Sequence, residues 1–451
     1  MIPEPFESQI HTTQCIIDNK GTLVQSDPGT GKTRAVLDAI KQMPGRTLVL
    51  GNLSILQPSW GMDIEKFTPE RTYAIAHGKY REAVMRGGTD IVVTNHDAVN
   101  WIVKDLSMIT DSAVPFTNLI IDESTAFKHR TSNRSKAVLK ISTFFNVKVL
   151  MSGTMMPNSI LDMWHQGLLC DGGERLGTKF WKFRDQVCMP EQTGPQPNMV
   201  KWVNKPGAIE SVADALRDIT VRFKLEDCID MPEHVVTMLA IDGDPKVMKM
   251  YRELAKKTRL EMETGTVSAI NAAALATKLS QLMSGAAYDA EGEVIKIHRE
   301  RYKLVVDLIR EREQCLVAFN WTHEKEALIQ EFQKAGISHR VIDGKVGWRQ
   351  RGEIVRGFQA GEFLVLLAQP QAASHGLTLT KATTTIWCSP TPNAEHFTQF
   401  NHRIYRAGQT RRTETVCIAT KGTREEHIYE LLEGKTSRQD LMLDILTNTI
   451  G

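Results

Sequence analysis

The sequence alternates short apolar runs with amphipathic stretches, and this alternation is what most restricts the fold. Between Thr22 and Gly153 the runs are rich in Val, Ile and Leu, are too short for helices, and end in polar residues or glycine. Helical patterns such as residues 32–43 lie between them. Strands alternating with helices predict a parallel sheet covered by helices on both faces. The expected strands lie at 22–26, 47–51, 72–76, 90–95, 118–123 and 148–153.

The same alternation returns after residue 300. The last segment, residues 424–446, carries apolar side chains at helical spacing, and we expect it to pack on this second part. The pattern therefore predicts a second α/β lobe. Its expected strands lie at 315–320, 339–343, 362–368, 383–389 and 413–419.

The sequence between the two α/β parts has a different character. Prolines and glycines cluster between Pro190 and Gly207, and we expect no regular structure there. Residues 246–265 and 268–283 have few β-branched runs and predict helices. The expected organisation is a first lobe over 1–165, a largely helical insertion over 166–299 and a second lobe over 300–451.

The composition excludes several classes of protein. Hydrophobic residues make up 41% and charged residues 24% of the 451 residues, which argues against a disordered or fibrous chain. The net charge is only +2, so a nucleic-acid surface would have to be local. Seven cysteines without a C-x-x-C pair argue against a zinc knuckle or a disulfide framework. Since no signal sequence or membrane-length apolar run is apparent, we expect a soluble, cytoplasmic protein.

A glycine-rich loop follows the first apolar run. Its sequence, SDPGTGKT at 26–33, matches G-x-x-x-x-G-K-S/T except that Ser26 replaces the first glycine. Glycines let successive backbone N–H groups surround phosphate oxygens, and the helix that follows favours anions at its N-terminus. Lys32 would add a charge for the β- and γ-phosphates, and Thr33 a hydroxyl for Mg²⁺. We predict an ATP–Mg²⁺ site made by Asp27, Pro28, Gly29, Thr30, Gly31, Lys32 and Thr33.

A second part of such a site is a carboxylate at the end of a strand. The apolar run at 118–121 leads directly into Asp122 and Glu123. Asp122 can hold Mg²⁺, and Glu123 can orient or deprotonate the attacking water. Taken alone, Asp-Glu after an apolar run is more often a strand meeting its turn, and the phosphate loop is what favours the catalytic interpretation.

Arginines are the third requirement, because charge develops on the transferred phosphoryl group. Arg403 and Arg406 are three residues apart on a predicted helix and would share one face. From spacing alone, a solvated basic face is an equally good interpretation.

Taken in order, these segments resemble the superfamily-two helicases and, within them, the Swi/Snf-type translocases. The resemblance covers most of the chain. The matching segments are FESQ (6–9), SDPGTGKT (26–33), TLVLGNLSILQPSWGMDIEKF (47–67), DIVVTNHDAV (90–99), DEST (122–125), MSGTMMPNS (151–159), IDGKVGWRQRGEIVRGFQAGE (342–362), ASHGLTLTKATTTIW (373–387), QFNHRIYRAGQTRRTETV (399–416) and GTREEHI (422–428).

The resemblance implies two RecA-like lobes with parallel sheets, and further site residues. Gln9 would sense adenine, Gly376 would lie near the γ-phosphate, and Asn95 and His96 would meet the nucleic-acid backbone. ATP would bridge Lys32 and Asp122 on one lobe to Arg403 and Arg406 on the other. ATP hydrolysis would then move the lobes along nucleic acid.

Three features depart from the family's usual pattern. Thr125 stands where His is usual, which puts in question how hydrolysis is coupled to lobe movement. Met156 displaces the usual proline to Pro157, in the block where Ser152 and Thr154 match. The insertion is short for a chromatin remodeller. The chain resembles the compact Swi/Snf-type helicases of phage and bacterial genomes more than a nucleosome remodeller, which implies the cytoplasm of a bacterial host.

Local basic tracts are candidates for phosphate contacts, although each tract alone is more often a solvated face. Non-specific binding requires phosphate contacts only, so no base-reading motif is needed. The aromatic residues Phe180, Trp181 and Phe183 could stack on bases, but packing of the insertion is the stronger interpretation. The candidate contact residues are Lys128, Arg130, Arg134, Arg349 and Arg351.

The leading hypothesis is a DNA-stimulated ATPase that moves along or remodels duplex DNA. One alternative is a helicase that separates strands or migrates branches on DNA or RNA. Another is a nucleotide-dependent binding switch with weak ATPase activity. We expect duplex DNA as the preferred partner and single-stranded DNA as a second, a monomer in isolation, no membrane, and accessory replication or recombination proteins as candidate partners.

Overall fold

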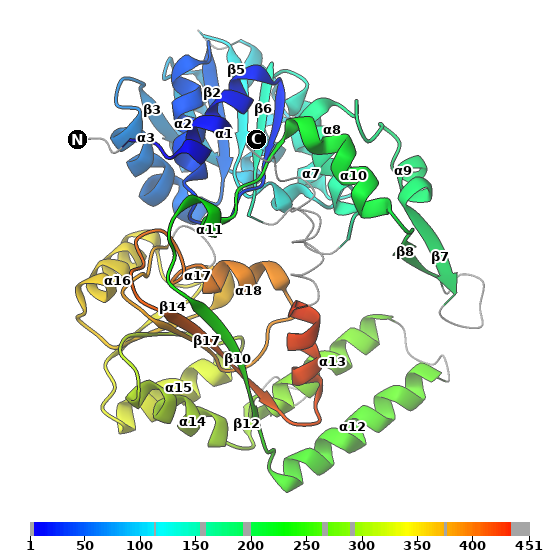
Figure 1. The fold of residues 1–451 in the computed structure, drawn as a ribbon, viewed down its shortest axis with the longest axis vertical. Helices are drawn as coiled ribbons and strands as arrows, with labels where there is room; N and C mark the ends of the chain where they lie inside the picture. Colours follow the sequence, from blue (N-terminus) through cyan, green and yellow to red (C-terminus); the bar gives the residue numbers. More distant parts are fainter. Residues whose placement is uncertain are drawn as a thin grey trace. The chain divides into compact units, whose positions relative to one another are not determined.

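The computed structural model divides the chain into two compact units, with the boundary along the chain between Asp230 and Met231 (Figure 1). The expected division into three parts stays a prediction. The structure describes residues 4–111, 114–153, 159–192, 200–263, 269–288, 294–373 and 377–433.

The first unit is built on a seven-stranded parallel sheet with the order β3-β4-β2-β5-β6-β1-β9. All six strands expected from the apolar runs are present, and β9 adds a short strand beside β1 that the sequence did not suggest. The strands are β1 (Gly21–Val24), β2 (Arg46–Gly51), β3 (Tyr73–Ala76), β4 (Ile91–Asn95), β5 (Phe116–Ile121), β6 (Val147–Met151) and β9 (Thr220–Val221).

Alternate residues of these strands enter two hydrophobic cores, one on each face of the sheet. Leu23 and Leu119 belong to one core, whereas their neighbours Val24 and Ile120 belong to the other. A sheet buried on both faces explains the nearly continuous apolar runs. The helices of this unit are α1 (Glu7–Asp18), α2 (Lys32–Gln42), α3 (Met62–Phe67), α4 (Arg81–Arg86), α5 (Val99–Ile102), α6 (Ser107–Thr110), α7 (Asn133–Ser142), α8 (Asp162–Asp171), α9 (Phe180–Val187), α10 (Ala208–Leu216) and α11 (Leu225–Cys228).

The second unit contains a six-stranded parallel sheet with the order β10-β17-β16-β13-β15-β14. All five expected strands are present, and β10, which lies in the expected helical insertion, adds a sixth. The two sheets confirm the predicted α/β fold class with two RecA-like lobes. The strands are β10 (His234–Ile241), β13 (Cys315–Ala318), β14 (His339–Ile342), β15 (Val365–Ala368), β16 (Thr384–Trp387) and β17 (Thr413–Thr420).

The helices of the second unit include the two long ones expected in the insertion. Residues 424–433 are also helical and bury Ile428, Tyr429 and Leu432 in the core, as predicted, while 434–446 lie outside the described residues. The other helices of this unit are α12 (Pro245–Glu263), α13 (Ala269–Met283), α14 (Glu300–Arg310), α15 (Thr322–Lys334), α16 (Trp348–Ala360), α17 (Pro370–Ala373) and α18 (Ala394–Asn401).

The expectation of irregular structure between Pro190 and Gly207 was wrong. Strands β7 (Cys188–Gln192) and β8 (Val200–Asn204) form an antiparallel pair in which Pro190 lies opposite Trp202. A two-stranded sheet consists of edges only, so the missing N–H of a proline is tolerated there. A second small pair, β11 (Ala286–Tyr288) and β12 (Val294–Lys296), also interrupts the expected helical insertion.

No helix in the described ranges combines the length and the apolar character needed to cross a membrane.

Candidate nucleotide-binding site

The glycine-rich loop joins the carboxyl end of β1 to the first residue of α2, as predicted. Gly29 and Gly31 have positive φ angles of 94° and 78°. The φ of Gly31 is one that residues with a Cβ atom rarely adopt, and a Cβ atom there would also lie 2.1 Å from Nε2 of Gln9, which would have to move. The loop can therefore bring its backbone N–H groups close to an anion.

The side chain of Lys32 folds back onto the phosphate loop. Its Nζ donates to the carbonyl oxygens of Ser26 and Asp27, at 2.6 and 3.0 Å. Burial lowers the pKa of Lys32 to about 8, although Glu123, Asp27 and Asp122 favour its charged form. The carbonyls are neutral acceptors, so an incoming phosphate offers this ammonium a stronger partner.

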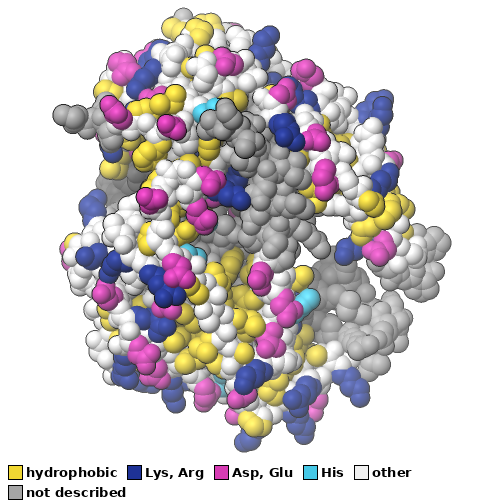
Figure 2. All heavy atoms as spheres, in the orientation of Figure 1, with side chains coloured by type: hydrophobic (Ala, Val, Ile, Leu, Met, Phe, Trp, Pro, Cys, Tyr) yellow, Lys and Arg dark blue, Asp and Glu magenta, His cyan; other side chains and the backbone are white. Residues whose placement is uncertain are grey.

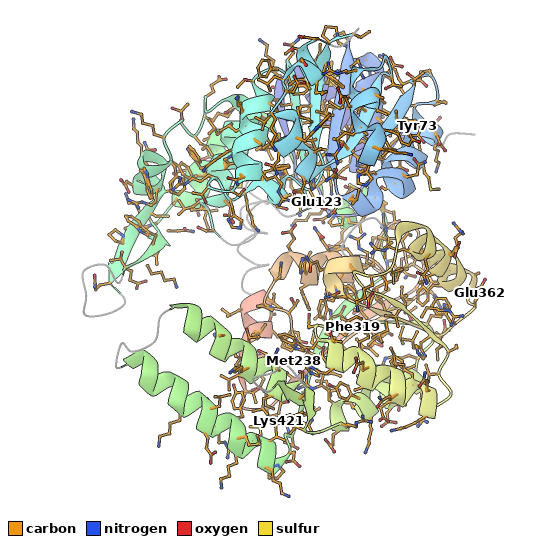
Figure 3. The ribbon with its side chains drawn as sticks, turned by 180° about the vertical axis from the view of Figure 1, so that it is seen from behind. Tyr73, Glu123, Met238, Phe319, Glu362 and Lys421 are labelled. Atoms are coloured by element: carbon orange, nitrogen blue, oxygen red, sulfur yellow. The ribbon has the colours of Figure 1, made fainter. Side chains whose placement is uncertain are left out.

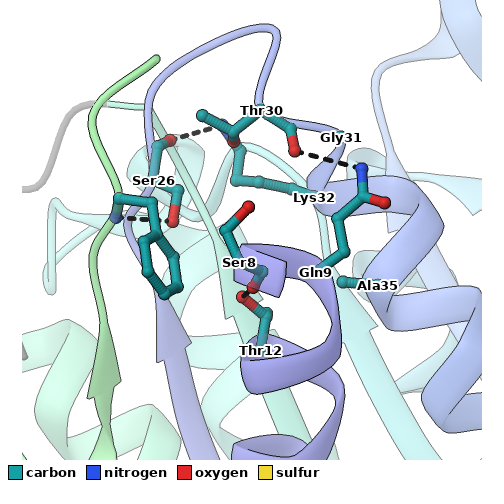
Figure 4. A pocket seen from close by; sticks show the side chains of 9 residues that line it. Ser8, Gln9, Thr12, Ser26, Thr30, Gly31, Lys32 and Ala35 are labelled. Atoms are coloured by element: carbon teal, nitrogen blue, oxygen red, sulfur yellow. Dashed lines mark hydrogen bonds between the residues drawn. The ribbon is translucent and has the colours of Figure 1, made fainter. Parts of the chain in front are cut away.

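The side chain of Gln9, on α1, lies across the loop (Figure 4). Its Nε2 donates to the Thr30 carbonyl at 3.3 Å, and its Oε1 accepts the Phe6 N–H at 3.0 Å. Together with Ser8, Thr12 and Phe223, these residues line a small pocket beside Gly31 and Lys32. The structure thus brings Gln9 to the loop, while its role with adenine stays a prediction.

Asp122 follows β5 at the carboxyl edge of the same sheet. Its Oδ2 accepts the indole N–H of Trp60 at 2.9 Å, and its Oδ1 accepts the backbone N–H of Glu123 at 3.0 Å. Burial raises the pKa of Asp122, while the indole and Lys32 oppose this rise. Glu123 has a φ of 49°, the only positive φ of a non-glycine residue in the described ranges, and Figure 3 shows it at this edge.

The residues present fit a nucleotide-bound Mg²⁺. A carboxylate and a hydroxyl are hard oxygen ligands, and Mg²⁺ usually takes one or two carboxylates together with substrate phosphates. Asp122 is a half-buried carboxylate that a cation would stabilise in its charged form, and Thr33 lies in the first turn of α2. Within the described residues no group of three or more His, Cys, Asp or Glu side chains could hold a metal ion by itself.

Ser152 and Gly153 lie directly beside the phosphate loop. The Ser152 N–H donates to the Val24 carbonyl at 3.0 Å, and a Cβ atom on Gly153 would lie 2.9 Å from Cγ of Pro28. Thr154, Met156 and Pro157 of the same block lie outside the described residues.

His96 does not have the position expected for a nucleic-acid contact. It is only 6% exposed, packs edge-on against Phe127, and places Nε2 2.7 Å from the Asp122 carbonyl. A carbonyl only accepts, so Nε2 carries the proton; burial lowers the pKa of His96 to about 4 and keeps the ring neutral. His96 therefore stabilises the backbone at Asp122. The other expected contact residue, Asn95, accepts a hydrogen bond from the Arg81 guanidinium at its Oδ1, at 3.3 Å.

In the second unit, Arg403 and Arg406 point to one atom. Their NH1 groups lie 3.2 and 2.9 Å from the carbonyl oxygen of Leu377. The expectation that both lie on a helix was wrong, because α18 ends at Asn401 and the arginines follow in turns. Gly376 lies outside the described residues.

Gln409 explains how this turn keeps its shape. It is 5% exposed, and its Nε2 lies within 3.1 Å of the carbonyls of Thr380, Ala382 and Ile404. Its Oε1 accepts the N–H groups of Thr410 and Arg411, each at 3.1 Å. The sequence analysis assigned no role to Gln409, or to Trp60, which bonds to Asp122. The only sequence signal for either residue was a side chain with a hydrogen-bonding group inside a segment that matches the family.

The basic tract at 128–136 is largely engaged within its own unit. The Arg130 guanidinium lies over the rings of Phe180 and Trp181, at 4.1 and 4.8 Å, and Arg134 pairs with Asp97 at 3.2 Å. Lys128 is half-buried after the 3₁₀ turn that contains Thr125. Contacts of these cations with nucleic acid stay a prediction.

Arg130 begins a series of alternating aromatic rings and guanidinium groups. Arg184 continues it, lying over Trp181 at 4.7 Å and over Trp202 at 3.5 Å. Phe183 is buried in the core, whereas Trp181 is 57% exposed. Figure 2 shows hydrophobic side chains together with Lys and Arg over α9 and the β7–β8 pair. The aromatic residues thus pack the hairpin and α9 together, the stronger of the two expected interpretations.

In the second unit, Arg351 is also engaged. It donates from NH1 to the Ala372 carbonyl at 2.9 Å, and burial lowers its pKa. The side chain of Arg349 lies outside the described part of the chain.

Comparison with known families identifies both units. Residues 11–286 match the SNF2-related domain. The chain belongs to the SNF2-related family. Residues 300–410 also match the helicase conserved C-terminal domain. This confirms the Swi/Snf-type resemblance inferred from the motifs.

Relatives of this SNF2-related protein occur in phages, bacteria and animals. Protein p41 of Acyrthosiphon pisum secondary endosymbiont phage 1 is 27% identical, and the match covers 98% of each chain. A Bacillus subtilis protein named as an ATP-dependent helicase/translocase, YwqA, is 22% identical over 94% of this chain and 46% of its own length. The mouse chromodomain-helicase-DNA-binding protein 1-like is 20% identical over 96% of this chain and 49% of its own. The chain thus spans nearly all of p41 and less than half of the other two.

A solved structure titled as the Sulfolobus solfataricus SWI2/SNF2 ATPase core in complex with dsDNA is also similar. The match has 18% identity and a TM-score of 0.45, and covers 98% of this chain and 94% of that one.

Proposed function

We propose that this SNF2-related protein hydrolyses ATP when it binds DNA and uses the energy to move along duplex DNA. The observation that carries the proposal is the arrangement at the edge of the first sheet. Lys32 of the phosphate loop and the half-buried carboxylate of Asp122 interact electrostatically there, with Glu123 beside them. Family membership supports the same activity.

The residues of the first unit would divide the chemistry among them. Lys32 would leave the carbonyls of Ser26 and Asp27 for the β- and γ-phosphates. Asp122 and Thr33 would hold Mg²⁺, which as a Lewis acid neutralises charge on the phosphate oxygens. Glu123 would orient the attacking water or take its proton. Trp60 and His96 would keep Asp122 in place through its carboxylate and its carbonyl.

Arg403 and Arg406 would supply positive charge to the phosphoryl group during hydrolysis. Their contacts with the Leu377 carbonyl place two guanidinium groups at one point. Such convergence suits an anion with several oxygens. The guanidinium groups of Arg403 and Arg406 would contact ATP in the hydrolysing conformation.

The deciding experiment measures ATPase rate with blunt duplex, single-stranded DNA and RNA across a salt titration. We expect duplex to stimulate at least as well as single strands, without dependence on base sequence. Stimulation should weaken steeply with salt, because affinity for B-DNA falls with a slope of about −0.9 per phosphate contacted. The variant Lys32→Ala serves as the inactive control. Stimulation by RNA alone would replace the proposal with an RNA helicase.

The second candidate is a nucleotide-dependent switch with weak ATPase activity. Thr125 is the observation that favours it, because it replaces a residue usual in coupling and is buried. No stimulation by any of the three nucleic acids, with ATP binding retained, would decide for the switch. We further propose that the protein acts in the cytoplasm of a bacterial host, as the phage origin of p41 suggests.

A further inference from the structure

The structure gives a reason for the serine that replaces the first glycine of the phosphate loop. The Ser26 hydroxyl accepts the backbone N–H of Phe223 at 3.0 Å, and Ser26 is buried (Figure 4). A glycine could not make this bond. The departure from the motif therefore marks a specific contact between the loop and a segment almost 200 residues later in the chain.

Asp27, the next loop residue, strengthens this contact. Its Oδ1 accepts from NH1 of Arg222 at 2.6 Å, and its Oδ2 accepts the N–H of Leu225 at 2.9 Å. Arg222 is only 2% exposed, so the ion pair is largely shielded from water. Charge-assisted bonds in such surroundings are stronger than neutral ones, and loss of one partner is costly.

Backbone bonds align the same two segments. The Gln25 N–H donates to the Val221 carbonyl at 2.9 Å, and the Asp27 N–H donates to the Phe223 carbonyl at 3.0 Å. These bonds continue the parallel pairing of β1 with β9 into the phosphate loop. We call the contacts of residues 25–27 with residues 221–225 the loop clamp.

The clamped segment leads directly to the junction between the two units. Residues 221–225 run into α11, which ends at Cys228, and the units divide between Asp230 and Met231. The other side of the clamp carries the two carbonyls that Lys32 holds, those of Ser26 and Asp27. When Lys32 moves to a phosphate, the residues that it releases are the ones bonded to the junction segment.

We propose that the loop clamp transmits the nucleotide state of the phosphate loop to the chain that joins the two units, with Arg222 as its positioning residue. The proposal rests on the proposed function, since it assigns a route by which ATP binding on one unit affects the other. Arg222 touches neither reacting atoms nor, in this role, nucleotide. It acts through Asp27.

The test compares Arg222→Gln with the original protein. Glutamine keeps a polar, uncharged side chain and cannot form the ion pair with Asp27. We expect ATPase without DNA, and the KM for ATP, to stay within about twofold, while stimulation by duplex DNA falls at least about fivefold, the lower end of typical coupling. Arg222→Lys, which retains the charge, should restore part of the stimulation.

Arg175→Gln is the matched control. It removes another guanidinium of the same unit, whose Nε donates to Asp218 at 2.9 Å, shortly before β9. This control should leave stimulation unchanged. Equal losses of unstimulated rate, KM and stimulation in Arg222→Gln, or unchanged stimulation, would each overturn the proposal.

A second measurement separates the clamp from the proposed function. Hydrogen exchange of residues 220–230 is followed with and without a slowly hydrolysed ATP analogue and Mg²⁺, in the absence of DNA. We expect the analogue to change exchange in this segment of the original protein, and the change to fall severalfold in Arg222→Gln while protection of residues 26–33 remains. A change that persists in the variant would overturn the clamp even if DNA stimulates the enzyme. A protein that DNA does not stimulate, but whose clamp responds to the analogue, would contradict only the proposed function.

Discussion

The phosphate loop of the first unit positions Lys32, and the turn after α18 in the second unit, here called the arginine turn, positions Arg403 and Arg406. The two segments hold these cations in different ways. In the loop, local backbone geometry does most of the work: two glycines with positive φ and the start of α2 place Lys32. In the turn, helix α18 ends before the arginines, and the buried side chain of Gln409 stabilises the backbone that follows by bonding to the carbonyls of Thr380 and Ala382. The first arrangement depends on neighbours in sequence, and the second on a residue that bonds to distant carbonyls.

The two regions share one kind of contact. Lys32, Arg403 and Arg406 each bond to backbone carbonyls. Arg301, buried in the second unit, donates to the Cys388 carbonyl and in addition pairs with Glu425 at 2.5 Å. Exchanging a neutral carbonyl for a phosphate gains a charge-assisted bond, whereas breaking a buried ion pair leaves a charge unpaired. A carbonyl contact alone does not mark a substrate site, because Arg46 also makes such contacts. The positions of Lys32, Arg403 and Arg406 in the segments that match the family's motifs single them out.

The largest expected effect tests the phosphate loop. Lys32→Ala should abolish ATP hydrolysis and leave the fold intact, because it removes a charge for phosphate and no core volume. ATPase assays with circular dichroism and a melting temperature measure both properties. A folded variant with near-normal turnover would remove the loop from the proposed site.

The arginine turn should give the next largest effect. Arg403→Ala and Arg406→Ala, made separately, should lower kcat by roughly 10³–10⁵, the range for an arginine finger, and change ATP affinity much less. Steady-state kinetics with a binding titration separate the two quantities. Arg411→Ala is the control, because the Arg411 guanidinium pairs with Glu313. Lost affinity with normal turnover at saturating ATP would contradict the role.

A smaller effect tests how the turn is held. Gln409→Ala should lower kcat by roughly 10- to 100-fold through misplacement of the arginines. It should also lower the free energy of unfolding of the second unit by about 1–3 kcal/mol, because buried partners lose their bonds. Gln359→Ala, which removes contacts to Thr380 and Lys381 nearby, is the matched control. Unchanged kcat in a destabilised Gln409→Ala protein would show that Gln409 only stabilises the unit.

The smallest effect concerns pH and sharpens the difference between lysine and arginine. With the pKa of Lys32 lowered to about 8, the free protein loses this charge as pH rises through 8, while the arginines stay charged. A bound phosphate favours the charged form, so binding takes up a proton above that pH. ATP affinity should be flat from pH 6.5 to 7.5 and then fall by up to about tenfold per pH unit. Fluorescent-nucleotide titrations measure this, and Lys32→Met should bind weakly with no such decline.

The regular part of both sheets was predictable from the sequence. Strands buried on both faces read as apolar runs, and every expected strand is present in the structure. Elements without such a signature were missed, and so was the edge strand β10, although its run HVVTMLAI is largely apolar. Strand β9 has two residues, and the β7–β8 pair contains a proline that usually argues against a strand.

Among the candidate site residues, the sequence by itself determined the phosphate loop, because its conformation follows from glycines and a helix start within eight residues. It also placed Asp122 at a strand end, since parallel strands end at a common edge. Only the tertiary structure decided the surroundings of these groups. The indole at Asp122, the neutral burial of His96, the anchoring by Gln409 and the bond from Phe223 to Ser26 all join residues far apart in the chain. Local sequence carries backbone preferences, but which distant donor meets a buried acceptor depends on how the whole chain packs.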